Sequence, residues 1–441
     1  MGAKVRGWLA GLVVLAVGST ARLALFFFYP PAKFSDSSTY RWLADRILDG
    51  WKDYNGTRTP GYPLFMALLG SDQNVYLVQL VLGVAVAAIL FYIGWRATGS
   101  PWFGAMTALG HALNVQQIFF EASLLSESLT AFWIALTALG VFLWMRSPGG
   151  RNWPLAIFTG TAAGLSGLTR PLFVFLPFWA ALVMALADSA GRLRLKWRPL
   201  AATILPGLLI IGTWVNFIHS RFAMWNLSTL TGYQLVQHTG YFFEYVPDQY
   251  AAIRDTYLRY RDERIREYGT QGNAIWAAIP DMMKASGMGF TTLDITLTKI
   301  SLQLIWQHPG LYLKTVWSGW WMFWLAPVYW RPEGFSLPGL REAMSVVVTL
   351  VHFLLIGVNT VFLASSLAAL VWRRLRKLWR VGAFPAFLAA TVWLTSVLQT
   401  LPDHGDNPRF LVPLQSLVVF WVIWIAYHWS KNRHEPLFHK G

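Results

Sequence analysis

Two polar segments of the chain carry residues whose types and spacing could do chemistry. The first, DSSTYRW, begins at Asp36, and the second, LPDHGDNPR, contains Asp403, His404, Asp406 and Arg409. A carboxylate can take the proton of a reacting hydroxyl, and carboxylates together with imidazole can bind a divalent metal ion. A metal site that combines Asp36 with His404 and Asp406 stays open, although no spacing of the H-E-x-x-H kind supports it and Gly-Asp-Asn-Pro is also an ordinary turn.

Two further acids, Glu121 and Glu127, flank a short turn ahead of an apolar stretch. They could orient the surroundings of Asp36, hydrogen-bond a sugar or hold a cation, so Glu121 joins the open set of metal ligands. As ordinary loop acids they would need no function at all.

The elements that position these residues must lie in a membrane. Hydrophobic residues make up 55% of the 441 residues and charged residues 13%, whereas a soluble domain has about 25% charged residues. This composition excludes a cytosolic enzyme, a secreted domain and a disordered scaffold. The absence of cysteine excludes disulfides, thiolate metal sites and a cysteine nucleophile.

Ten stretches are apolar over the ~20 residues that a membrane-crossing helix needs. The first is too long for a removable signal peptide and lacks a small-residue cleavage site. The predicted spans are 8–29, 74–95, 101–120, 128–145, 154–169, 171–187, 199–219, 345–371, 383–401 and 411–429.

Lysine and arginine orient these spans. Lys4 and Arg6 precede the first span and place the N-terminus in the cytoplasm. Counted alternately from there, the cytoplasmic segments, including the C-terminal tail, carry 17 basic and two acidic residues, so the whole net charge of +15 lies on that side. Nucleic acid is not needed to explain the charge, and most acids lie on the outer face.

The spans divide the chain into three predicted regions. These are an N-terminal transmembrane module (1–220, with a first outer loop at 30–73), a large outer segment (221–344) and a C-terminal region of transmembrane helices with a short tail (345–441). We interpret the outer segment as a cap that selects an acceptor.

The Trp-rich stretch 314–330 is apolar enough to be an eleventh span. Counting it as one would place Arg373–Arg380 outside, against the charge rule, and tryptophan is enriched at the headgroup level. We therefore predict that it is interfacial or re-entrant.

The first outer loop predicts an amphipathic helix over 36–51 that lies flat on the membrane. Asp36 occupies its N-cap position, where capping alone would explain an aspartate. Downstream, Arg58-Thr-Pro-Gly-Tyr-Pro63 predicts a rigid turn back to the membrane. An apolar stripe at helical spacing supports the helix and consists of Tyr40, Leu43, Ala44, Ile47, Leu48 and Trp51.

This loop resembles that of the GT-C glycosyltransferases, and most of all the branch of protein O-mannosyltransferases and lipid A aminoarabinose transferases. The similarity covers about residues 8–220 and 383–429. Three later motifs fit the same resemblance in order: Ser126-Glu127-Ser128-Leu129, Gly167-Leu168-Thr169-Arg170-Pro171 and Asn407-Pro408-Arg409-Phe410-x-x-Pro413.

The resemblance implies an all-α GT-C-like bundle of ten or eleven transmembrane helices. It also implies a polyprenyl-phosphate monosaccharide donor and transfer, with inversion, to a glycan, lipid or protein acceptor on the outer face. Asp36 would be the base, with Glu127 as a second catalytic candidate. The lack of disulfides and the short tails fit a bacterial inner membrane with a periplasmic site.

The same resemblance implies that arginines hold the donor phosphate, because guanidinium binds phosphate oxygens bidentately. Snorkelling to headgroups is the alternative for each arginine. Arg22 lies well inside the first span and must pair with Glu121, Glu127 or the phosphate. The candidate substrate-binding residues are Arg58, Arg170, Arg409, Tyr40, Tyr62 and Arg22.

Two other functions remain open. A polysaccharide polymerase or ligase also handles lipid-linked sugars with outer loops, and a lipid or sugar transporter is a second alternative. Transporters tend to have repeated halves and polar residues at mid-membrane, and neither pattern is evident in this sequence.

Overall fold

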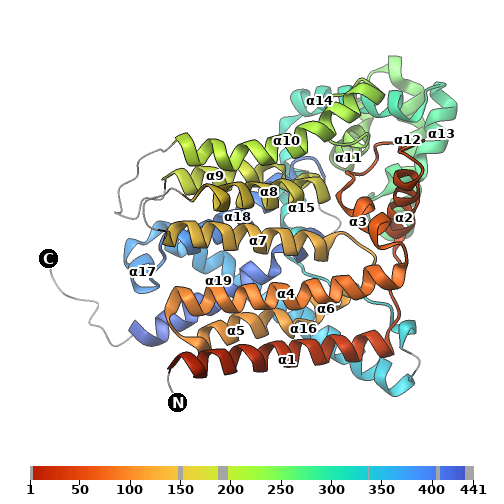
Figure 1. Ribbon diagram of the computed structural model, residues 1–441. Helices are drawn as coiled ribbons and strands as arrows, with labels where there is room; N and C mark the ends of the chain where they lie inside the picture. Colours follow the sequence, from red (N-terminus) through yellow and green to blue (C-terminus); the bar gives the residue numbers. More distant parts are fainter. Residues whose placement is uncertain (1–2, 148–151, 187–196, 336, 404–407, 433–441) are drawn as a thin grey trace.

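The computed structural model describes residues 3–147, 152–186, 197–335, 337–403 and 408–432, and over these the chain is helical without a strand (Figure 1). An isolated parallel bridge joins Ala32 to Ser123. The prediction of an all-α protein is confirmed.

The helices follow one another in the order of the predicted regions. The N-terminal region contains α1 (Ala3–Phe28), α2 (Ser35–Leu48), α3 (Gly61–Leu69), α4 (Asp72–Thr98), α5 (Pro101–Ala112), α6 (Val115–Ala122), α7 (Glu127–Arg146), α8 (Trp153–Thr169), α9 (Leu176–Leu186) and α10 (Trp197–Phe222). The outer segment contains α11 (Thr231–Thr239), α12 (Ala251–Tyr268), α13 (Ala274–Ser286), α14 (Phe290–Gln307) and α15 (Pro309–Phe323). The C-terminal region contains α16 (Pro338–Val371), α17 (Arg373–Leu378), α18 (Ala383–Thr400) and α19 (Gln415–Asn432).

Among the residues that the structure describes, seven helices are long and apolar enough to cross a membrane, which makes the chain a multi-pass membrane protein. They lie at Gly7–Phe28, Asp72–Thr98, Glu127–Arg146, Trp197–Phe222, Gly339–Val371, Ala383–Thr400 and Arg409–Asn432. The other three predicted spans fall on shorter helices, so the described residues contain seven candidate spans, and the number of ten crossings remains a prediction.

Local chemistry explains why two of these three predicted spans form short helices. The stretch 101–120 breaks after α5, where Asn114 accepts a hydrogen bond from the backbone N–H of Gln116 and caps α6. The stretch 171–187 begins with Pro171 in a 3₁₀ turn before α9. The third helix, α8, has 17 residues. All three helices pack beside the long ones, so they belong to the bundle whatever their depth in the membrane.

The two ends of the bundle differ in chemistry (Figure 1). One end carries the basic helix α17 and the adjoining ends of α1 and α19. There, Arg146 donates to the backbone carbonyl of Arg96, and Asn432 donates to that of Leu378. The opposite end carries α2, α3 and the helices α11–α14. The bundle therefore separates the basic helix α17 from α2, which carries Asp36.

Small residues bring α8 close to α10. A Cβ atom on Gly164 would lie 2.8 Å from the Cα of Gly207, and one on Gly160 would overlap the backbone of Thr203. Contacts of this kind are how helices pack tightly in lipid, where no hydrophobic force drives them together. This packing fixes the C-terminal end of α8, which leads directly into Arg170.

The predicted loop helix forms as α2, but its start differs from the prediction. The N-cap residue is Phe34, and the Ser37 hydroxyl accepts the Phe34 backbone N–H. Asp36 is therefore not the cap but a residue of the first turn, and its carboxylate is free for other partners. Tyr40, Leu43 and Ala44 of the predicted stripe are buried.

The Trp-rich stretch is only half helical. α15 ends at Phe323, and its 15 residues are fewer than a span needs. Trp317 and Trp321 are half exposed or more. The interfacial or re-entrant placement of this stretch remains a prediction.

The outer segment has a core of its own, built from α11–α14. Asp294 on α14 is fully buried and accepts hydrogen bonds from the backbone N–H groups of Gly232 (2.6 Å) and Tyr233 (3.3 Å) at the start of α11. Gly232 is required there, because a Cβ atom would lie 2.7 Å from the backbone nitrogen of Thr298. Burial raises the pKa of Asp294 to about 6, against the lowering effect of the two N–H donors.

We predict that Asp294→Asn flattens the pH dependence of the stability of this segment. An acid whose pKa is higher folded than unfolded binds more protons when folded, so stability falls as the pH rises from about 4 to about 6. The amide keeps the acceptor oxygen and does not ionise. Thermal unfolding between pH 4 and 8 tests this, and an unchanged pH slope would contradict it.

Candidate active site

The start of α2 is pinned to the segment that precedes α7. Ala32 donates its N–H to the Ala122 carbonyl (2.8 Å) and accepts from the Leu124 N–H (2.9 Å). The Ser37 hydroxyl donates to the Leu124 carbonyl (2.9 Å). These bonds join two segments 90 residues apart, and so the first turn of α2 lies beside the first turn of α7.

The predicted rigid turn brings Arg58 to the same place. The Tyr54 hydroxyl donates to the Arg58 carbonyl (3.1 Å). Gly61 lies against the end of α8, where a Cβ atom would be 2.7 Å from the backbone of Thr169. Glycine at this position lets the turn approach Arg170, the residue that follows α8.

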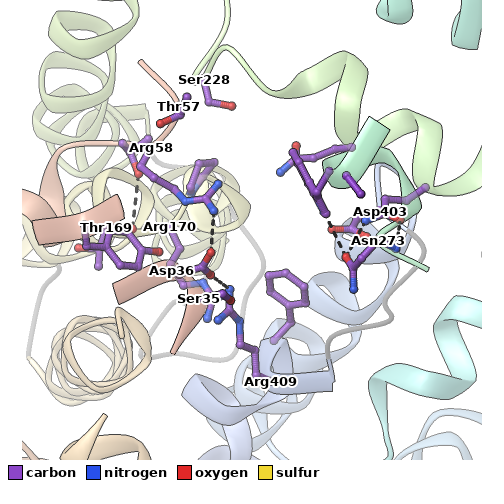
Figure 2. Close-up of a pocket in the computed structure, with 18 residues that line it drawn as sticks. Ser35, Asp36, Thr57, Arg58, Thr169, Arg170, Ser228, Asn273, Asp403 and Arg409 are labelled. Atoms are coloured by element: carbon purple, nitrogen blue, oxygen red, sulfur yellow. Dashed lines mark hydrogen bonds and ion pairs between the residues drawn. The ribbon is translucent and has the colours of Figure 1, made fainter. Parts of the chain in front are cut away.

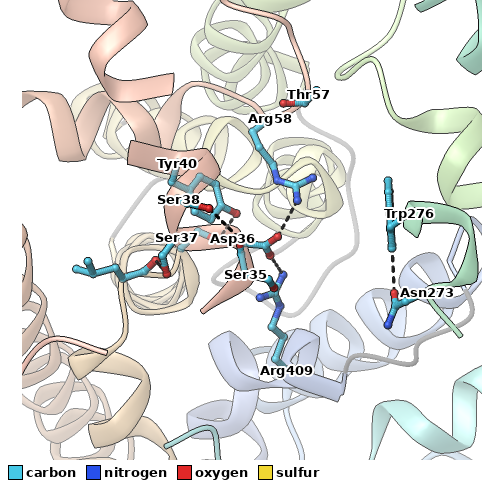
Figure 3. A network of polar contacts seen from close by, with 12 residues as sticks. Ser35, Asp36, Ser37, Ser38, Tyr40, Thr57, Arg58, Asn273, Trp276 and Arg409 are labelled. Carbon is cyan, nitrogen blue, oxygen red and sulfur yellow. Dashed lines mark hydrogen bonds and ion pairs between the residues drawn. The ribbon is translucent and has the colours of Figure 1, made fainter. Parts of the chain in front are cut away.

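Five charged side chains of alternating sign form a row at this end of the bundle, in the order Arg58, Asp36, Arg409, Glu127 and Arg170. Arg58 donates to one Asp36 oxygen (2.9 Å), and Arg409 donates to the other. Figures 2 and 3 show both guanidinium groups converging on this carboxylate. We call these five residues the charge row.

The row continues from Arg409 to Glu127, whose side chain is 1% exposed. Its Oε1 lies 3.0 Å from Nη1 of Arg170 and 3.3 Å from Nε of Arg409. Both are ion pairs without hydrogen-bond geometry. The Arg170 guanidinium also lies over the Phe410 ring, 4.7 Å from its centroid. Glu127 thus forms ion pairs with two arginines that line the cavity.

Asp36 is ionised in this arrangement. Burial alone would raise its pKa, but the Arg409 and Arg58 guanidinium groups outweigh that effect and hold the pKa well below its usual range. The position of Asp36 in the first turn of a helix also favours its negative charge.

The row borders a cavity of about 620 Å³, within the range of small-molecule sites. Asp36, Arg58, Arg170 and Arg409 line it, and so does Tyr40. Glu127 does not line the cavity, so it cannot touch a ligand there without a rearrangement.

The two predicted tyrosines differ in position. Tyr40 borders the cavity, and its ring centroid lies 6.0 Å from the Arg58 guanidinium. Tyr62 is fully buried behind it and donates to Gln79 (2.8 Å). The Tyr62 ring therefore supports Tyr40, at a centroid distance of 4.9 Å.

Arg22 and Glu121 form a separate pair inside the bundle. Nε and Nη2 of Arg22 each lie 2.7 Å from a Glu121 oxygen, and both side chains are at most 2% exposed. Arg22 also donates to the carbonyls of Gly18 and Ala112. Arg22 therefore pairs with Glu121 and not with Glu127. Neither Arg22 nor Glu121 lines the cavity that Asp36 borders, so Glu121 does not share a site with Asp36.

The open metal site gains no support from the residues that the structure describes. Among these residues no group of three or more histidines, aspartates and glutamates could hold a metal ion. His404 and Asp406 lie outside the described residues. Asp403 also borders the cavity.

The opposite wall of the cavity was missed by the sequence analysis. It comes from α11 and the start of α13 and carries Gln234, Gln237, Asn273 and Trp276. Uncharged amides in a long outer segment form no periodic pattern or motif, so the sequence held no signal for them.

The fold and the site define a multi-pass helical membrane protein with a charged cavity at one end of its bundle. Two solved structures are similar to it, those of ArnT from Cupriavidus metallidurans bound to undecaprenyl phosphate and in the apo state. They are 14% identical to this chain, cover 94% and 95% of it and 78% of their own chain, and have TM-scores of 0.37 and 0.38.

ArnT is a lipid A aminoarabinose transferase, from the branch that the sequence motifs resemble. No protein-family model and no curated protein matches the chain.

We predict that Glu121→Leu destabilises the fold by about 3–5 kcal/mol, because it leaves the Arg22 charge buried without a partner. Replacing both partners, with Arg22→Met and Glu121→Leu together, should recover most of this loss. Thermal unfolding in detergent compares the three proteins. Equal stability of the single and double variants would contradict the prediction.

Proposed function

We propose that the chain is an integral-membrane glycosyltransferase. It moves a monosaccharide from a polyprenyl-phosphate carrier to a glycan, lipid or protein acceptor on the outer face, with inversion. The charge row is the observation that supports this proposal most directly, together with the motif resemblance described above. It supplies one carboxylate and three guanidinium groups beside a cavity.

The balance of charge in the row suits a phosphodiester. Three arginines and two acids leave one positive charge in excess, and a sugar linked to a polyprenyl phosphate carries one negative charge. The row thus offers a site that this phosphate would neutralise. Guanidinium is suited to the task because it binds two phosphate oxygens at once and sheds water readily.

Binding of the phosphate would also prepare the base. Asp36 accepts the hydrogen bonds of Arg58 and Arg409, and a donor phosphate would compete with it for them. When the phosphate engages these arginines, they shift from the carboxylate, and the pKa of Asp36 rises toward its usual range. A stronger base then faces the cavity only when the donor is present.

The transfer itself needs one proton acceptor and no general acid. Asp36 takes the proton of the acceptor hydroxyl as that oxygen bonds to the anomeric carbon. The bond between this carbon and the phosphate oxygen breaks, and its electron pair stays on the phosphate. The arginines stabilise the second negative charge that develops there. Attack from the side opposite the phosphate inverts the anomeric centre.

Glu127 has a different role in this proposal from the one expected for it. It pairs with Arg170 and Arg409 and does not border the cavity. It acts as a positioning residue that keeps two phosphate-binding arginines in place, while Asp36 alone handles the proton.

We predict that Asp36→Asn lowers turnover of a polyprenyl-phosphate monosaccharide by about 10²–10⁴-fold, the usual contribution of a base. Affinity for polyprenyl phosphate should stay equal or rise, because the competing carboxylate charge is gone. Purified protein in nanodiscs allows both measurements. Turnover that survives would remove Asp36 as the base, and failure of the wild type to bind the carrier would favour a polymerase or a transporter.

Asp49→Asn is the matched control. Asp49 follows the same helix, is 55% exposed and pairs with Arg46 rather than with the charge row. The same chemical change at this position should leave turnover and binding as in the wild type.

We further propose that the protein lies in a bacterial inner membrane, with both termini in the cytoplasm and the cavity on the periplasmic face. The chain has no cysteine, so single cysteines can report sidedness. We predict that a membrane-impermeant maleimide labels Lys52→Cys and Glu333→Cys without inner-membrane permeabilisation, and labels Lys377→Cys only after it. Labelling of Glu333→Cys only after permeabilisation would make 314–330 a full span.

A further inference from the structure

The cavity has two chemically different walls (Figure 2). The wall formed by the charge row is ionic. The other wall, formed by α11 and the start of α13, presents amides and one indole ring, and we call it the cap wall. Asp403 lies beside it and already has an interaction partner. The charge row accounts for a phosphate, and the cap wall has no part in the transfer described so far.

Asn273 is held in a defined orientation on the cap wall. Its backbone is left-handed (φ 65°), which asparagine tolerates better than most residues. Its Oδ1 accepts from Gln237 Nε2 (3.0 Å) and Trp276 Nε1 (3.1 Å), and its backbone N–H donates to Gln237 Oε1 (3.1 Å). With the carbonyl side occupied twice, the Nδ2 group remains as a donor on an exposed residue at the cavity.

Trp276 is fixed by the same contacts (Figure 3). Its N–H is used by Asn273, so the indole offers the cavity a ring and no donor. The side chain is 38% exposed, although tryptophan is usually well buried. An exposed ring locked by a hydrogen bond provides a flat surface for the apolar C–H face of a ligand.

The helix α11 that completes the wall is rigidly anchored. Asp294 holds its first turn, and the Thr239 hydroxyl contacts that of Ser301 (3.0 Å) near its end. Gln234 and Gln237 are three residues apart and face the same way. Gln237 is engaged with Asn273, whereas Gln234 is half-buried at the cavity. Its amide can both donate and accept.

We propose that the cap wall binds an uncharged sugar ring, stacked on Trp276 and hydrogen-bonded through its hydroxyls by Asn273 and Gln234. A flat aromatic surface flanked by neutral amides matches the alternating apolar faces and hydroxyl edges of a pyranose. It offers no cation for a uronic acid. This inference rests on the proposed function only for the source of the ring, which is either the donor sugar or a sugar of the acceptor.

The test compares the wild type with Trp276→Ala in nanodiscs. The probes are polyprenyl phosphate, a polyprenyl-phosphate neutral hexose and the corresponding amino sugar, followed by free methyl glycosides observed by saturation-transfer NMR. Trp276→Phe keeps an aromatic ring and should retain most binding, which guards against a folding defect in the alanine variant. Trp306→Ala, at a tryptophan that is 87% exposed and remote from the cavity lining, is the matched control.

We expect Trp276→Ala to weaken binding of the hexose-linked carrier by about tenfold and to leave the sugar-free carrier unaffected. This result assigns the ring to the donor. If both carriers bind normally but the free neutral glycosides lose their signal, the cap wall still binds a sugar and the ring belongs to the acceptor.

Other outcomes overturn the proposal. They are equal loss of both carriers, no effect on any probe, an effect shared by Trp306→Ala, or a preference for the amino sugar. If the wild type binds free neutral glycosides through Trp276 but no polyprenyl phosphate, the proposed function fails and the assignment of the cap wall stands.

Discussion

The ion pair between Asp36 and its two arginines is the interaction on which the rest of the site depends. Arg58 and Arg409 reach this carboxylate from segments 22 and 373 residues away. Charged side chains that are largely buried are stable only when groups of opposite charge lie beside them. Alternation of sign along the charge row is therefore what allows three basic and two acidic side chains to gather at one end of an apolar bundle.

Much of the packing serves to hold these segments in place. The bridge at Ala32 brings the start of α2 to α7, and Gly61 lets the Arg58 turn lie against the end of α8. Gly160 and Gly164 in turn fix α8 on α10. Under the proposed function, a displacement of about 1 Å would be enough to weaken the catalytic arrangement, so these small residues would contribute to it through the helix positions that they allow.

The sequence predicted those parts of the structure that depend on averages over many residues. Long apolar stretches became helices, because the burial of apolar side chains is summed over whole segments. Arg58, Arg170 and Arg409 were also predicted, because each stands in a short motif beside a helix end. The structure brings all three to Asp36 and Glu127.

The parts that were not predicted depend on single side-chain orientations. Asp36 was expected to cap its helix, but the helix begins two residues earlier, with Phe34 as the N-cap and the Ser37 hydroxyl accepting the Phe34 N–H. Glu121 and Glu127 are six residues apart and flank the same turn. Glu121 nevertheless pairs with Arg22 inside the bundle, whereas Glu127 pairs with Arg170 in the charge row. Spacing along a loop does not reveal which way a side chain points.

The two arginines that stabilise the Asp36 carboxylate also make it a weaker base. A base must hold its proton well enough to remove it from a hydroxyl, but two guanidinium groups lower the pKa of Asp36. A donor phosphate competes for the same guanidinium groups and would remove that restraint. In the proposed mechanism, the contacts between Asp36 and its two arginines would keep the base weak until the phosphate displaces them. Acceptor and donor would then have to be bound together for the proton to move, so the charge row would couple the chemistry to occupancy of the whole cavity.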